Sequence, residues 1–222
     1  GYAQGHDEAA ETLAALRATG AAAHASQADV ADAAQVARMF AEAQRALGGG
    51  VEILVNNAAI THDALLMLLA EDAWDRVIDT DLRGVYLCCR AALRPMIRAR
   101  GGRIVNLASP AAFLGKAGAS SYAAAKGGVV ALTKSLAREV ARHGITVNAV
   151  SPGLVETDLI AGMAPAVRRD LERRIPLGRL ATPEEIAAAP AALSPDGVLL
   201  SGASFGELLR ALAAPGAGPP PA

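Results

Sequence analysis

The stretch VEILVNNAA, residues 51–59, decides the fold class. It is a short, nearly continuous apolar run that ends in two asparagines, as expected of a buried strand that leaves a parallel sheet into a loop. Two similar runs follow, GRIVNLAS at 102–109 and GITVNAVSPG at 144–153. Helix-like segments lie between them, and this alternation predicts βαβ units around a doubly wound parallel sheet.

The remaining stretches complete the pattern. Apolar positions at helical spacing predict helices over 7–19, 31–50, 70–80, 82–99 and 119–143. Gly20 and Gly48 are expected to end the first two helices, because glycine readily adopts the left-handed conformation found there. A further short strand is expected at 21–30.

Composition narrows the class of protein. The chain has 222 residues, which suits one domain, and is 52% hydrophobic but only 3% aromatic. Its formal charge of −1 gives no indication of nucleic acid or an anionic membrane as a partner. No apolar run approaches the roughly 20 residues of a spanning helix. Cys88 and Cys89 lack metal-ligand spacing, so we predict reduced thiols, no metal site and a cytoplasmic location.

The predicted topology locates a site before any motif is considered. Ligands of open parallel sheets bind outside the carboxyl ends of the strands. The loops after Val30, Val55, Leu107 and Val150 should therefore carry the chemistry, and each is flanked by polar or turn residues.

The segment SSYAAAKGG, residues 120–128, supplies a candidate reacting group. Tyr122 and Lys126 are four residues apart, so their side chains leave the same face of a helix. A nearby ammonium favours the phenolate and should bring the tyrosine pKa down from its usual value near 10. Ser109, at the end of a strand, can donate a hydrogen bond to a carbonyl oxygen. These three groups suit carbonyl reduction, although a tyrosine–lysine pair alone is usually an ordinary helix surface.

Four motifs in order then resemble a known family. NNAA at 56–59, Ser109, YAAAK at 122–126 and SPGLVETD at 151–158 resemble the short-chain dehydrogenase/reductases, from about Ala9 to Thr182. Within that family, the sequence is most similar to those of bacterial 3-oxoacyl-[acyl-carrier-protein] reductases. The resemblance implies a Rossmann-like, three-layer α/β/α fold with its N-terminal βαβ element truncated.

The resemblance also implies an activity and a set of site residues. The reaction would be reduction of a 3-oxoacyl thioester, on acyl carrier protein or coenzyme A, with NADP(H) as cofactor and NAD(H) as the alternative. Tyr122 would be the general acid, Ser109 would orient the carbonyl, Lys126 would bind the nicotinamide ribose and tune the tyrosine, and Asp81 would be the fourth catalytic member. The cofactor-binding positions would be Asp29, Val30, Asn56, Ala58, Tyr122, Lys126, Pro152, Gly153 and Thr157.

Asp81 departs from the family, which usually has asparagine at this position. The family role is largely a main-chain one and would survive the change. A carboxylate adds a negative charge near Tyr122, however, and should raise the tyrosine pKa and oppose Lys126. We therefore expect reduced activity.

Both ends of the sequence also depart from the family. The opening strand and its T-G-x-x-x-G-x-G turn are not found in residues 1–222, which predicts a fragment of a longer product. We expect an incomplete dehydrogenase/reductase domain over 1–206 and a divergent, disordered tail over 207–222. Two alternatives follow: another short-chain alcohol dehydrogenase, acting for example on a sugar or steroid, or an inactive fragment or pseudoenzyme.

Partners can be suggested from charge and from helix faces. Two basic groups could receive an acidic acyl carrier, although a solvated helix end explains them equally well: Arg98, Arg100, Arg103, and Arg138, Arg142, His143. By resemblance, the helices over 82–99 and 119–143 would form the interface of a homotetramer or homodimer.

Overall fold

The computed structural model describes residues 1–156 and 164–188. Three strands form the sheet, namely β1 (Ile53–Asn56), β2 (Gly102–Leu107) and β3 (Ile145–Val150). The main helices are α1 (His6–Ala18), α2 (Ala33–Leu47), α3 (Glu71–Ile78), α4 (Gly84–Ala99), α6 (Ser120–Val140), α8 (Pro165–Arg174) and α9 (Pro183–Ala188). Shorter elements are the 3₁₀ turns η1 (Leu66–Leu68) and η3 (Ala141–His143), the π-helical turn η2 (Asp79–Arg83) and helix α5 (Ala111–Leu114).

The three strands predicted from the apolar runs are confirmed. They form a parallel sheet in the order β1-β2-β3. The register aligns Asn56 with Asn106 and Leu107 with Val150, so the strands end at one common edge. The loops expected to carry the site therefore leave the sheet side by side.

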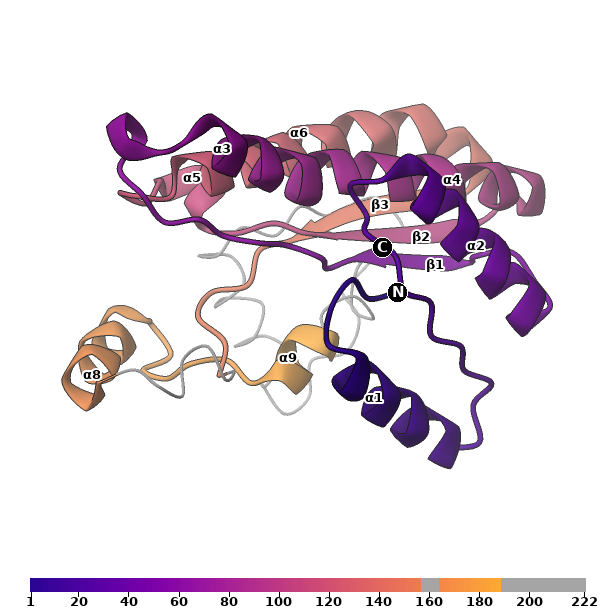
Figure 1. The fold of residues 1–222 in the computed structure, drawn as a ribbon, viewed down its shortest axis with the longest axis horizontal. Coiled ribbons are helices and arrows are strands. Elements are labelled where there is room, and N and C mark those ends of the chain that lie inside the picture. The colour runs from indigo at the N-terminus through magenta and orange to yellow at the C-terminus, as the bar shows by residue number, and fades with distance from the viewer. Residues whose placement is uncertain (157–163, 189–222) are drawn as a thin grey trace, which may run out of the picture.

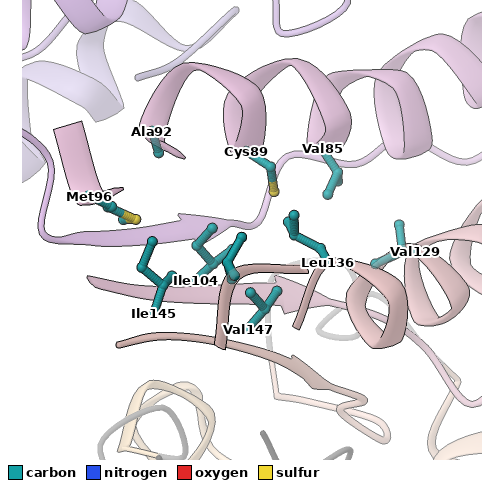
Figure 2. Packing of buried hydrophobic residues seen from close by; sticks show 10 residues of the cluster. Val85, Cys89, Ala92, Met96, Ile104, Val129, Leu136, Ile145 and Val147 are labelled. Carbon is teal, nitrogen blue, oxygen red and sulfur yellow. The ribbon is translucent and has the colours of Figure 1, made fainter. Parts of the chain in front are cut away.

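Helices lie on both sides of this sheet. Figure 1 shows α3, α4, α5 and α6 on one side, and α1, α8 and α9 on the other. Side chains from α4 and α6 pack on the strands in the main core (Figure 2), which comprises Val85, Cys89, Ala92, Met96, Ile104, Val129, Leu136, Val140, Ile145 and Val147. The core is aliphatic, as the composition predicts, and it fixes the sheet against α4 and α6.

Helices α3 and α4 are joined by the π-helical turn η2. The cap positions on both sides of the turn keep right-handed helical backbone angles, so the chain runs from α3 into α4 without a loop. A π turn inserts one extra residue into a helix and is frequent at functional sites. The side chain of Asp81 in this turn is completely buried.

The prediction of a strand over 21–30 is wrong. In this stretch the structure has an isolated parallel bridge between Tyr2 and Gln27. Tyr2 N donates to Ser26 O at 3.1 Å, and Ala28 N donates to Tyr2 O at 2.8 Å. A strand requires a partner along its length, and among the described residues Tyr2 alone provides this pairing.

The first two helices form as predicted but differ in what they bury. No residue of α1 is buried. Helix α2 is preceded by Asp32, whose carboxylate accepts hydrogen bonds from Ala34 N and Gln35 N, and is followed by Gly48 with a φ of 74°. Val36 of α2 packs against Leu87 and Cys88 of α4, so α2 is anchored to the core through α4. Within the described parts of the chain, no helix is long and apolar enough to cross a membrane.

We expect Gly84→Ala to destabilise the fold. A Cβ at position 84 would lie 2.7 Å from Val30 Cγ2 and 3.3 Å from the Val30 carbonyl oxygen. The matched control is Gly127→Ala, where the nearest atom would be Ala112 O at 4.0 Å. Alanine in a helix is otherwise favoured over glycine by about 1 kcal/mol, so the control should be stabilising. Overpacking at Gly84 should cost about 1–3 kcal/mol.

The measurement is the free energy of unfolding in urea. If Gly84→Ala and Gly127→Ala stabilise the chain equally, the close approach of Val30 to α4 is not a structural constraint.

Candidate active site

The end of β2 places Ser109. Ala108 N donates to Val150 O at 2.8 Å, which continues the pairing with β3 one residue beyond β2. Ser109 therefore leaves the sheet beside the end of β3. Its hydroxyl accepts from Ala111 N at 3.2 Å, which ties it to the start of α5.

Tyr122 and Lys126 lie on the first two turns of α6. Lys126 Nζ is 5.6 Å from the centre of the Tyr122 ring. The lysine side chain is 2% exposed and donates to Leu107 O, at the end of β2, at 2.9 Å. The side chain of Ser109 lies near enough to the Tyr122 phenol to lower its pKa. The structure thus brings together the serine, tyrosine and lysine predicted from sequence.

Asp81 joins this cluster from the π turn. Its Oδ2 lies 3.6 Å from Lys126 Nζ, and neither side chain is more than 2% exposed. Its Oδ1 accepts from Ile60 N at 2.8 Å, in the loop that follows β1. Oδ2 has no hydrogen-bond partner among the described residues. The carboxylate therefore lies between a main-chain donor and a buried ammonium.

The buried environment shifts the pKa of each group. Burial raises the pKa of Tyr122, and the Asp81 carboxylate raises it further, while the Ser109 side chain and Lys116 lower it. Burial lowers the pKa of Lys126, against the opposing effect of Asp81. Burial also raises the pKa of Asp81, against the Ile60 hydrogen bond and Lys126.

The expectation that the pKa of Tyr122 is lowered is wrong. The sequence predicts that Lys126 lowers the pKa of Tyr122, whereas in the structure the tyrosine pKa is raised. The physical reason is that the phenol is partly desolvated and that the lysine has a carboxylate of opposite charge beside it. The expected contribution of Asp81, to raise the tyrosine pKa, is present.

A cleft of about 950 Å³ lies beside β1. It is bounded by β1 and the loop after it on one side, and by residues 1–4 and 28–31 on the other. Four of the predicted cofactor positions line it, namely Asp29, Val30, Asn56 and Ala58. Among the described strands, β1 pairs only with β2, so the opposite edge of β1 faces this cleft.

The residues that line the cleft fit the adenosine end of a nicotinamide dinucleotide. Asp29 is exposed in the cleft and its Oδ1 accepts from Ala31 N at 2.9 Å, which shapes the turn where an adenosine would lie. Tyr122 and Lys126 are not among the residues that line this cleft, and the Lys126 side chain is 2% exposed. A pyrophosphate is usually held by main-chain N–H groups at a helix start, and the described lining includes no glycine-rich helix start.

The loop after β3 contains the remaining predicted cofactor residues. Pro152 and Gly153 follow the buried Ser151. Just beyond them, Ala181 N donates to Leu154 O at 3.0 Å and Glu156 N donates to Ala181 O at 2.8 Å, which fixes the path of the loop. Thr157 and the predicted tail 207–222 lie outside the described residues.

A buried amide network was missed by the sequence analysis. Asn56 Nδ2 donates to Asn106 Oδ1 at 2.8 Å, and Asn106 Nδ2 donates to Thr133 Oγ1 at 2.9 Å. It links β1, β2 and α6 directly below the site. Asn56 therefore combines a position in the cleft wall with a structural role. The available signal was Asn106, a polar residue inside the apolar run of β2.

The two basic groups come together on a different edge of the sheet. Arg98 and Arg100 lie at the end of α4, Arg138 lies in the last turn of α6, and Arg142 and His143 lie in η3. Arg103 is paired with Thr146 near the amino ends of β2 and β3. This edge is opposite to the one that carries Ser109 and Tyr122. The prediction that an acyl carrier docks on these residues therefore places the carrier away from the candidate site.

The cysteines are buried free thiols. Burial raises the pKa of Cys88 to about 11 and that of Cys89 to about 12, so neither is a reactive thiolate near neutral pH. Within the described parts of the chain, no cluster of His, Cys, Asp or Glu could hold a metal ion.

Comparison with known proteins agrees with this arrangement. A family profile described as enoyl-(acyl carrier protein) reductase matches residues 2–204. The chain belongs to the short-chain dehydrogenase/reductase family. The fold comparison agrees: a crystal structure of a candidate gluconate dehydrogenase from Agrobacterium tumefaciens superimposes with a TM-score of 0.83, at 30% identity, over 92% of this chain and 84% of that one.

Curated relatives in the short-chain dehydrogenase/reductase family are more similar in sequence. The 3-oxoacyl-[acyl-carrier-protein] reductase FabG of Vibrio cholerae is 46% identical over 155 residues, which is 69% of this chain and 64% of the relative. FabG of Chlamydia muridarum is 44% identical over 67% of this chain and 61% of the relative. FabG of Escherichia coli is 44% identical over 70% and 64% respectively. The chain thus spans less than two thirds of the length of these relatives.

The amide network should be important for stability. Replacing Asn106 with leucine removes the acceptor of the buried Asn56 amide, and a buried polar group without its partner costs about 1–3 kcal/mol. Asn57→Leu is the matched control, because Asn57 is exposed, and its effect should stay within about 0.5 kcal/mol. Thermal and urea unfolding would measure both. Equal stabilities of the two variants would contradict a structural role for the network.

Proposed function

We propose that this chain carries the catalytic residues of an NADPH-dependent reductase that converts a 3-oxoacyl thioester to the 3-hydroxyacyl form. The observation that carries the proposal is the convergence of Ser109, Tyr122 and Lys126 at the carboxyl edge of the sheet, with Lys126 fixed to Leu107 O. Identity of 44–46% to 3-oxoacyl-[acyl-carrier-protein] reductases supports the choice of substrate.

Each residue has a definite part in this proposal. NADPH supplies the hydride that is added to the carbonyl carbon. Tyr122 transfers its phenolic proton to the carbonyl oxygen, which becomes the hydroxyl group of the product. Ser109 donates a hydrogen bond to the same oxygen as negative charge develops on it. The raised pKa of Tyr122 keeps the phenol protonated at neutral pH, and this is the form required for reduction.

The cofactor positions follow from the cleft. Asp29 and Val30 would hold the adenosine, and Asn56 and Ala58 would line the groove. By family resemblance, Lys126 would hold the nicotinamide ribose. Pro152, Gly153 and Thr157 would contact the carboxamide. Among residues 1–4, which border the cleft, none is acidic. This favours the 2′-phosphate of NADP(H) over NAD(H).

We expect Tyr122→Phe to reduce the rate of NADPH oxidation with acetoacetyl-coenzyme A. Loss of a positioned general acid typically costs about 10²–10⁴-fold in rate. Tyr86→Phe is the matched control, because Tyr86 is an exposed tyrosine on α4 whose hydroxyl accepts from Arg90. The control should keep full activity.

Turnover that survives Tyr122→Phe would remove this residue from the proton step. NADPH binding, followed by its fluorescence, is measured in parallel on the unmodified chain. Failure of the chain to bind NADPH would favour an inactive fragment over a reductase.

A further inference from the structure

The ion pair between Asp81 and Lys126 has a setting unlike that of the surface ion pairs. Both side chains are almost completely buried, and the carboxylate oxygen nearest Lys126 has no hydrogen-bond partner among the described residues. The other carboxylate oxygen is held by Ile60 N at 2.8 Å. Asp81 is thus fixed in position by the main chain, with its free oxygen directed at the ammonium.

We infer that Asp81 is a positioning residue that neutralises the Lys126 ammonium inside the protein and thereby sets the pH range in which Tyr122 can donate its proton. This inference rests on the proposed role of Tyr122 and deepens it, because it assigns a pH-setting function to Asp81, which acts on the tyrosine through its charge.

The geometry explains why the effect should reach the tyrosine. Lys126 Nζ lies 5.6 Å from the Tyr122 ring, a distance at which an unpaired ammonium would favour the phenolate. Asp81 Oδ2 lies 3.6 Å from Lys126 Nζ, so the pair has no net charge. Tyr122 then lies in the field of a dipole and not of an isolated positive charge. The carboxylate itself also acts directly on Tyr122 and raises its pKa.

Few other charges can act on this group. Helices α3, α4 and α6 pack against the π turn. Apart from Lys126, the charged side chains of these helices are all exposed: Glu71, Asp72, Asp75, Arg76, Arg90, Arg94, Arg98, Lys134, Arg138 and Glu139. Asp79 and Arg83 of the turn pair with one another at the surface. Lys116, before α6, acts on Tyr122 and pairs with Asp63 at 2.8 Å.

The test is a direct titration of Tyr122 in the full chain. The chain has three tyrosines, so Tyr2→Phe with Tyr86→Phe leaves Tyr122 as the only phenol, and phenolate absorbance reports its ionisation without turnover. In this background, Asp81→Asn should shift the titration midpoint of Tyr122 to lower pH by about one unit. Lys126→Met should shift it to higher pH. Circular dichroism at each pH identifies the range in which the fold persists.

Controls separate charge from structure. Asp75→Asn removes a carboxylate that is exposed on α3 and should leave the midpoint unchanged. Asp81→Ser is the second variant should Asp81→Asn fail to fold, because its hydroxyl can still accept from Ile60 N, and it should show the same downward shift. A midpoint unaffected by loss of Asp81 would overturn the inference, since it would mean that Asp81 carries a proton and no charge.

Activity adds an independent reading. Reduction requires the protonated phenol, so its rate falls as pH rises through the pKa of Tyr122, and Asp81→Asn should move this decline to lower pH. If the titration shifts but no reductase activity is found, the pairing is correct and the proposed function is wrong. If reductase activity is present and the titration midpoint does not shift, the proposed function is correct and the inference about Asp81 is wrong.

Discussion

The buried ammonium of Lys126 is the interaction on which the site depends. It donates to Leu107 O at the end of β2 and faces Asp81 Oδ2 in the π turn, so one side chain of α6 ties together three elements. A buried lysine is costly without such partners, and removing one member of a buried pair typically costs about 3–5 kcal/mol. The position of Tyr122, one turn earlier on α6, is fixed as a consequence.

The π turn between α3 and α4 makes this arrangement possible. It turns the Asp81 carboxyl group inward, where it meets the main chain of Ile60 and the lysine. The same turn leads directly into Gly84, where the absence of a side chain allows Val30 to approach α4 closely. A single irregularity in a helix thus positions both a charge in the site and one wall of the cleft.

Sequence was sufficient for features that depend on local pattern. Apolar runs predicted the three strands, and the spacing of Tyr122 and Lys126 predicted that both lie on one helix face. It was insufficient where a distant partner decides the outcome. Residues 21–30 form a single bridge because Tyr2 is their only described partner. The pKa of Tyr122 depends on burial, on Ser109 and on Asp81, which is 41 residues away in sequence.

The direction of the strands also restricts how a substrate carrier can approach. Arg103 lies in β2 and Ser109 two residues beyond its end. They are six residues apart, so at about 3.3 Å for each extended residue they are separated by about 20 Å. A carrier bound at the arginines would have to pass its acyl group around the sheet to reach Tyr122. Basic charge at the amino ends of the strands is better explained by the helix C-termini that end there, where positive side chains are favourable. The arginines at the amino ends of the strands are therefore not evidence for a carrier-docking surface.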